Sequence, residues 1–222
     1  MSWESSLLYY QIINQGVKEK LGGHHSAKSL MFSVDFHEIK TLQHEGKWDE
    51  ATKIMIDSAQ KLESGGADCI VICTNTMHKM AKEVEESVSI PLLHIADATA
   101  NEIVECGIKK VALLGTAFTM EQDFYKGRLI EKFGLDVIVP NEAARKIVHD
   151  IIYEELCLGI INENSKQSYL EIINSLVQDG VEAVILGCTE ITLLISQLDC
   201  SVPIFDTTKI HAEYAVDFAL KD

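Results

Sequence analysis

Two residues capable of proton transfer, Thr74 and Cys188, occupy the same place in two degenerate copies of one segment. The first copy, GADCIVICTNT, covers residues 66–76, and the second, GVEAVILGCTE, covers residues 180–190. Each has a glycine, an apolar run and a small polar cluster, and the copies align at a constant offset of 114 residues. If they belong to two similar lobes that face each other across a pseudo-twofold axis, a hydroxyl and a thiol oppose one another over one cleft. Two groups on opposite sides of one carbon atom form the arrangement that a racemase needs.

A cysteine at position 188 could remove the α-proton of an amino acid if its thiolate is available. A thiol has a reference pKa of about 8.5, which a helix N-terminus lowers. Because Cys188 precedes a predicted helix, we expect a lowered pKa. The carbanion also needs electrostatic stabilisation. Backbone N–H groups at the two predicted helix starts could bind the substrate carboxylate and its developing charge, and they belong to Asn75, Thr76, Thr189 and Glu190.

The hydroxyl of Thr74 stays protonated at neutral pH, so Thr74 is predicted to donate a proton rather than remove one. The enzyme would then start efficiently only from the enantiomer whose α-hydrogen faces Cys188. Simpler explanations exist, because strand-end cysteines often only pack and Thr74–Thr76 could only cap a helix. For Cys188 the repeat partner and the flanking motif favour a catalytic role, whereas for Cys69 and Cys73 packing is the favoured interpretation.

Strands alternate with helices along the chain, which predicts an α/β fold of two pseudo-symmetric lobes. Each lobe is a short parallel sheet covered by helices, with the active site in the cleft between them, at the carboxyl ends of the strands. Lobe one comprises residues 1–97 and 206–222, and lobe two comprises residues 98–205. The predicted strands are 30–36, 69–73, 91–93, 111–114, 135–139, 181–186 and 203–205. The predicted helices are 5–20, 48–63, 77–86, 98–106, 122–133, 145–158, 166–178 and 191–197.

The same offset leaves lobe one without a counterpart to the predicted strand KVALLG, which ends at Gly115. That counterpart would end near Met1. A sheet that lacks a central parallel strand leaves two neighbouring strands unpaired. We therefore expect the natural start to lie upstream of Met1; the alternative is a protein that tolerates an incomplete sheet.

The formal net charge of -15 argues against nucleic acid and anionic membrane surfaces as partners, because both require clustered Lys and Arg. No apolar run approaches the roughly 20 residues that span a bilayer, and no signal-peptide pattern is present, which predicts a cytoplasmic protein. The six cysteines form no CxxC pair and no His spacing typical of zinc. We therefore expect no metal site and reduced thiols.

The whole chain resembles the aspartate/glutamate racemase family. The similarity rests on MSWESS at the start, SVDFHEI, CTNTMH around Thr74, HIADAT, LLGTAFTMEQDFY, EELCLG and GCTEI around Cys188. It is greatest to the L-aspartate/glutamate-specific racemases, in which threonine replaces one of two catalytic cysteines. In this chain the cysteine lies one residue earlier, at Cys73. The resemblance implies two α/β lobes, no cofactor and a homodimer, with Met1 and Gln43 contacting the substrate.

Together these features predict a pyridoxal-independent racemase of aspartate and glutamate, with Cys188 as the thiolate base and Thr74 as the opposing proton donor. The resemblance points to the L isomer as the better substrate. One alternative is a hydantoin racemase or an arylmalonate decarboxylase, which arrange cysteine similarly. The other is a catalytically silent small-ligand-binding protein, which Thr74 and the absent strand would favour.

Overall fold

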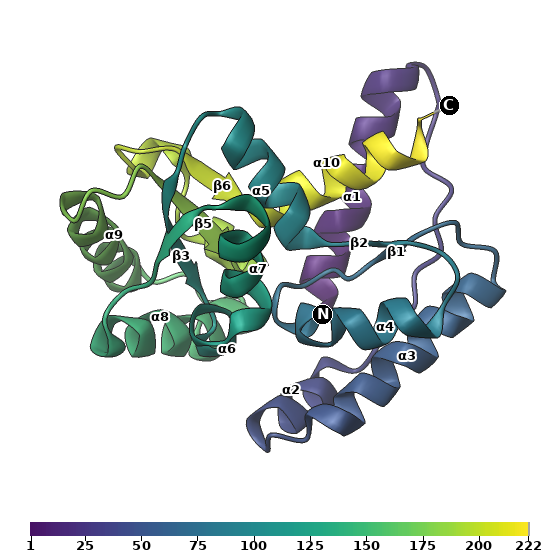
Figure 1. Cartoon of the computed structure of the whole chain (residues 1–222), viewed down its shortest axis with the longest axis horizontal. Coiled ribbons are helices and arrows are strands. Elements are labelled where there is room, and N and C mark those ends of the chain that lie inside the picture. The colour runs from purple at the N-terminus through teal and green to yellow at the C-terminus, as the bar shows by residue number, and fades with distance from the viewer. Residues whose placement is uncertain (222) are drawn as a thin grey trace. The chain divides into compact units, whose positions relative to one another are not determined.

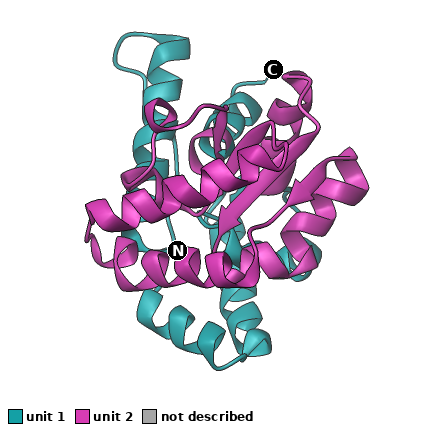
Figure 2. Ribbon diagram, turned by 90° about the vertical axis from the view of Figure 1, so that its left-hand side faces the viewer, with its two compact units in different colours: residues 1–94, 211–222 teal, residues 95–210 magenta. Residues whose placement is uncertain are grey.

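The computed structural model describes residues 1–221, which form two compact units (Figure 2). Unit 1 contains Met1–His94 and the residues from His211 onward, and unit 2 contains Ile95–Ile210. No helix in the described part of the chain is both long and apolar enough to cross a membrane.

Unit 2 contains a four-stranded parallel sheet with the strand order β4-β3-β5-β6. The strands are β3 (Lys110–Gly115), β4 (Asp136–Ile138), β5 (Ala183–Gly187) and β6 (Ile204–Asp206). Each residue of β5 is buried, because helices cover both faces of the central strands. Gly115 and Gly187 are paired where β3 and β5 end, and a Cβ on either would lie 2.9 Å from a backbone oxygen of the neighbouring strand. Only glycine permits this close approach.

The helices of unit 2 lie around this sheet (Figure 1). They are α5 (Ile95–Glu105), α6 (Ala117–Glu121), α7 (Asp123–Phe133), α8 (Glu142–Glu154) and α9 (Glu163–Gln178). Three short 3-10 segments, η2 (Leu156–Leu158), η3 (Thr189–Leu193) and η4 (Gln197–Asp199), connect the elements. Helix α5 packs on α7, and α8 packs on α9.

Unit 1 has two short parallel strands, β1 (Ile70–Val71) and β2 (Leu92–Leu93). Its helical elements are α1 (Trp3–Leu21), α2 (Phe36–His44), α3 (Trp48–Ser64), η1 (Thr76–Met80) and α4 (Ala81–Ser87). Helix α10 (Thr207–Ala219) begins in unit 2 and contributes its residues from His211 onward to unit 1. A buried apolar cluster joins α2, α3, η1 and α4 to the strands, and it includes Ile39, Met55, Ile70, Met77 and Val84.

The internal repeat extends to the first residues of the chain. The side chain of Ser2 caps α1 by accepting from the N–H of Ser5 at 3.1 Å. At the offset of 114 residues, Thr116 caps α6 by accepting from the N–H of Thr119 at 3.3 Å. The two parallel sheets and the helices that cover them confirm the predicted α/β class.

The predicted strand at residues 30–36 is wrong. Residues 30–35 have no regular secondary structure, and the side chains of Leu30, Met31 and Phe32 are exposed. A strand requires a neighbour for its hydrogen bonds, and within residues 1–221 unit 1 has no strand that corresponds to β3. The carboxylate of Asp35 then caps α2, a helix that the sequence analysis did not predict.

The predicted helix at residues 191–197 is also wrong, because this region contains the two 3-10 segments η3 and η4. Ser196 has an extended backbone and forms a capping box with Asp199, which starts η4 afresh. Helices α6 and α10 were not predicted either.

Candidate active site

Thr74 lies in a tight turn after β1. Its backbone N–H donates to the carbonyl oxygen of Ile72 at 2.7 Å. The preceding carbonyl, that of Cys73, accepts from the nitrogen of Met1 at 2.7 Å and from the hydroxyl of Ser5 at 2.8 Å. Several hydrogen bonds therefore fix the backbone of this turn, and Met1 takes part in it.

The predicted carboxylate-binding residues of unit 1, Asn75 and Thr76, are buried and open η1. Gln43 is also buried, and its amide nitrogen donates to the sulfur of Met77 at 3.0 Å. The structure therefore places all three predicted residues of this group in or against η1. Cys73 lies beside them, and burial raises its pKa to about 11, so its thiol keeps its proton at neutral pH.

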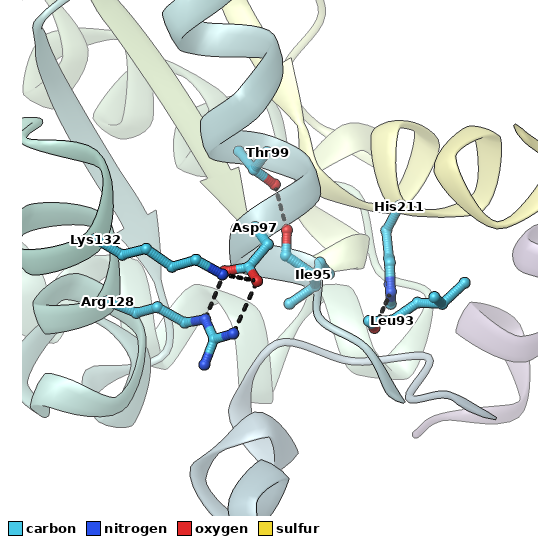
Figure 3. Close-up of polar contacts among 7 residues, drawn as sticks. All are labelled: Leu93, Ile95, Asp97, Thr99, Arg128, Lys132 and His211. Atoms are coloured by element: carbon cyan, nitrogen blue, oxygen red, sulfur yellow. Dashed lines mark hydrogen bonds and ion pairs between the residues drawn. The ribbon is translucent and has the colours of Figure 1, made fainter. Parts of the chain in front are cut away.

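Three buried histidines lie next to the Thr74 turn. The imidazole of His78 lies 4.6 Å from that of His94 and 5.7 Å from that of His211, measured between ring centroids. His211 donates from Nε2 to the carbonyl oxygen of Leu93 at 2.7 Å (Figure 3).

Cys188 follows β5 in unit 2, at the position equivalent to Thr74. Its thiol donates to Oε2 of Glu190, with a sulfur–oxygen distance of 3.1 Å. The hydroxyl of Thr189 donates to the same oxygen at 2.5 Å. The structure thus brings together the three predicted site residues of this unit, with the carboxylate accepting from the other two.

The expected lowering of the Cys188 pKa is wrong. Burial, the carboxylate of Glu190 and the nearby Cys157 raise the pKa of Cys188 well above its ordinary value. The segment that follows is the five-residue 3-10 helix η3, whose dipole is smaller than that of an α-helix of several turns. As the side chains lie here, Cys188 is a protonated thiol.

Sequence reasoning missed the residues that surround Cys188 from other elements. Tyr153, near the end of α8, is buried, and burial raises its pKa strongly, with smaller contributions from its neighbours Cys188, Cys157 and Glu190. The only sequence signal was the EELCLG segment, which contains Cys157 and follows Tyr153 directly.

Both arginines form ion pairs within unit 2. Arg128 donates to Asp97 through Nε at 2.5 Å and Nη2 at 2.8 Å, and Lys132 donates to the same carboxylate at 2.6 Å (Figure 3). Arg145 donates to Glu121 at 2.8 Å. These contacts join helices of unit 2.

An open cavity of about 740 Å³ lies between α6 and α8, and none of its lining residues belongs to the predicted site. It is lined by Ala117, Glu121, Asn141, Glu142, Ala143, Lys146, His149 and Asp150. Among these residues, Lys146 forms an ion pair with Asp150.

Comparisons with known proteins agree with these features. The model of the Asp/Glu/Hydantoin racemase family matches residues 1–215. A solved structure of a candidate Asp/Glu racemase from Yersinia pestis is 56% identical, covering 100% of this chain and 96% of that chain, with a TM-score of 0.94. An aspartate racemase homologue from Pyrococcus horikoshii is 37% identical, covering 98% of this chain and 95% of that chain, with a TM-score of 0.84.

A broad-specificity amino-acid racemase of Bacillus subtilis is 28% identical over 171 residues, which are 76% of this chain and 72% of that protein. The racemases among these relatives are isomerases. With the family model covering nearly the whole length, the chain belongs to the Asp/Glu/Hydantoin racemase family.

Proposed function

We propose that the protein is a cofactor-independent racemase that inverts the α-carbon of aspartate and glutamate. In this proposal Cys188 transfers a proton on one face of the α-carbon and Thr74 on the other. Family membership supports the reaction class, and the resemblance to the L-aspartate/glutamate-specific racemases supports the substrates. It also supports a homodimer in the cytoplasm.

One observation carries the assignment of the two residues. Thr74 and Cys188 each follow the matched strand of an internally repeated unit, β1 or β5, at the same offset as the caps of α1 and α6. The turn after each strand also holds residues with backbone N–H groups suited to a carboxylate, Asn75 and Thr76 in one unit and Thr189 and Glu190 in the other. The proposal requires these two turns to face one bound amino acid.

The protonation state of Cys188 is coupled to that of Glu190 through the contact between them. Two neighbouring anions in a buried place are unfavourable, so the pair holds one proton, and the raised pKa of Cys188 assigns that proton to sulfur. In the proposed first step the thiol proton moves to Oε2 of Glu190, which becomes a neutral acid beside the thiolate. The thiolate then takes the α-proton, and the electron pair of the broken C–H bond delocalises into the substrate carboxylate.

In the second step the hydroxyl of Thr74 gives its proton to the opposite face of the α-carbon, while solvent water returns a proton to the Thr74 oxygen. Cys188 keeps the α-proton until it exchanges with solvent. Glu190 gives the proton first taken from Cys188 to the hydroxide that remains, which restores the starting protonation of both residues. No redox change occurs and the charges balance over the cycle.

The Thr74/Cys188 pair is chemically unequal, and the inequality has a defined signature. The two enantiomers have equal free energies, so kcat/KM must be the same in both directions, and the expectation that the enzyme starts efficiently from only one enantiomer cannot hold for kcat/KM. The difference appears instead as solvent exchange: the enantiomer whose α-hydrogen faces Cys188 gains deuterium from heavy water faster than it inverts.

The raised pKa of Cys188 favours a second candidate, a catalytically silent protein that binds a small acidic ligand. One experiment separates the two. The purified protein is incubated in heavy water with each enantiomer of aspartate and glutamate, and the α-proton signal and the optical purity are followed together. Exchange with inversion supports the racemase, whereas binding by calorimetry without exchange refutes it and supports the silent homologue.

A further inference from the structure

The carbonyl oxygen of Thr74 accepts a hydrogen bond from the imidazole of His78, with an Nδ1–O distance of 2.8 Å. A carbonyl oxygen can only accept, so Nδ1 of His78 carries a proton. The backbone N–H of His78 also donates to the carbonyl of Asn75 at 3.0 Å. His78 therefore closes this turn with both its side chain and its backbone.

The surroundings of His78 keep its imidazole neutral. Its ring packs against His94 and His211, and all three side chains are buried. His211 donates from Nε2 to Leu93, so its Nδ1 accepts from the hydroxyl of Tyr9 at 2.8 Å. Burial and the two neighbouring imidazoles hold the pKa of His78 well below its ordinary value. A neutral ring with its hydrogen on Nδ1 is thus the form that contacts Thr74.

Both peptide groups that flank the α-carbon of Thr74 are held in place. The carbonyl before it, that of Cys73, accepts from Met1 and Ser5 at 2.7 and 2.8 Å. The carbonyl after it accepts from His78 at 2.8 Å. Because peptide groups are planar, fixing both of them fixes the φ and ψ angles of Thr74 and the direction of its Cα–Cβ bond. That bond directs the hydroxyl.

The equivalent position in unit 2 makes a different contact. Thr192 corresponds to His78 at the offset of 114 residues, and its hydroxyl donates to the carbonyl of Thr189 at 2.8 Å. The hydrogen bond of Thr192 therefore reaches the residue after Cys188 and not Cys188 itself. The longer imidazole of His78 reaches back to Thr74 itself, and this contact goes beyond what the internal repeat dictates.

We propose that His78 is a positioning residue whose Nδ1–H group fixes the peptide plane after Thr74, and thereby aims the Thr74 hydroxyl at the α-carbon. This inference rests on the proposed function of Thr74 as the proton donor on one face. It gives His78 no direct contact with the substrate.

Two matched variants test the proposal. His78→Asn places an amide N–H near the position of Nδ1 and retains a donor for Thr74. His78→Gln places its amide near the position of Nε2 and leaves the Thr74 carbonyl without that donor. Both variants place a neutral amide in the buried site of the imidazole. If His78 only supports the fold, the two variants should therefore lose activity to a similar degree. Thermal unfolding compares their stabilities.

We expect His78→Asn to keep the inversion rate within about threefold of wild type, and His78→Gln to lower it by about tenfold or more, since small misplacements of a reacting group are costly. Deuterium incorporation into the enantiomer that faces Cys188 should change less than about threefold in both variants. Equal inversion rates in the two variants, or parallel losses of exchange and inversion, would overturn the proposal.

A measurement on the wild-type protein is independent of activity. Long-range ¹H–¹⁵N spectra of histidine-labelled protein should show His78 as the Nδ1–H tautomer throughout about pH 5.5 to 8, with the signal assigned by its loss in His78→Gln. An Nε2–H tautomer, or a ring that gains a proton in this range, would overturn the inference. Absence of solvent exchange in active-site assays of the wild type would instead refute the proposed function, so the two failures are distinguishable.

Discussion

The thiol of Cys188 donates to the carboxylate of Glu190 across 3.1 Å, and this contact adds to the effect of burial in keeping the proton on sulfur. A carboxylate that accepts from a thiol stabilises the protonated sulfur, and its charge opposes formation of the thiolate. Glu190 therefore raises the pKa of Cys188, and in the proposed mechanism it also receives the thiol proton.

Replacement of Glu190 by Gln should separate these two effects. Removing the negative charge lowers the pKa of Cys188, so alkylation of Cys188 by iodoacetamide, followed by mass spectrometry, should begin at lower pH than in wild type. Racemisation should nevertheless fall by about 10²-fold, because no carboxylate receives the thiol proton. Retention of full activity in this variant would show that Glu190 is not part of the proton path.

Replacement of Cys188 by Ala should abolish deuterium incorporation at the α-carbon, with a loss of at least about 10³-fold. Thr74→Ala should lower inversion while exchange on the Cys188 side persists. Cys106→Ala, at an exposed cysteine, serves as the control and should behave like wild type. Unchanged exchange in Cys188→Ala would refute the assignment of the base.

Replacement of Thr74 by Cys should make the two faces of the site more alike. A thiol can both remove and return a proton, so each enantiomer should then gain solvent deuterium before it inverts. The ratio of exchange to inversion, measured by NMR and chiral chromatography, should approach the same value from both enantiomers. A ratio that stays as unequal as in wild type would contradict the proposed role of Thr74.

Acid should destabilise the protein partly through His211. Burial lowers its pKa from 6.5 to about 4 in the folded state. Between these values the unfolded chain holds a proton that the folded chain lacks, so stability falls as the pH drops from 6.5 to 4 and levels off below. The full shift corresponds to about 3 kcal/mol. In urea unfolding, the free energy of unfolding of His211→Gln should depend less on pH in this window than that of wild type. His25→Gln, at an exposed histidine, should keep the pH dependence of wild type.

Replacement of Asp97 by Asn should destabilise unit 2 by about 1–3 kcal/mol, because Arg128 and Lys132 lose the carboxylate they share. The side chain of Asp97 is only 19% exposed. Asp57→Asn is the matched control, since it breaks the exposed pair with Lys61 and should cost less than about 0.5 kcal/mol. Equal effects in urea unfolding would show that the Asp97 cluster contributes no more than a surface pair.

Much of the fold and of the site follows from local patterns. Apolar runs followed by polar turns located β3 and β5, and they placed Thr74 and Cys188 after matched strands. The stretch at residues 30–36 has an equally apolar pattern, yet it forms no strand. A strand depends on a hydrogen-bonding neighbour that can be distant in sequence, so local pattern does not decide it.

The sequence by itself determined the α/β class, the internal repeat and the positions of the candidate acids and bases, because these depend on periodicity and order along the chain. Only the tertiary structure decided their protonation and orientation. The pKa of Cys188 depends on its burial and on Cys157, which comes from another element. The backbone of Thr74 is held by Met1 and Ser5, far from it along the chain. Protonation and orientation could not be predicted from the sequence because electrostatic fields and hydrogen bonds act through space, between residues that are distant along the chain.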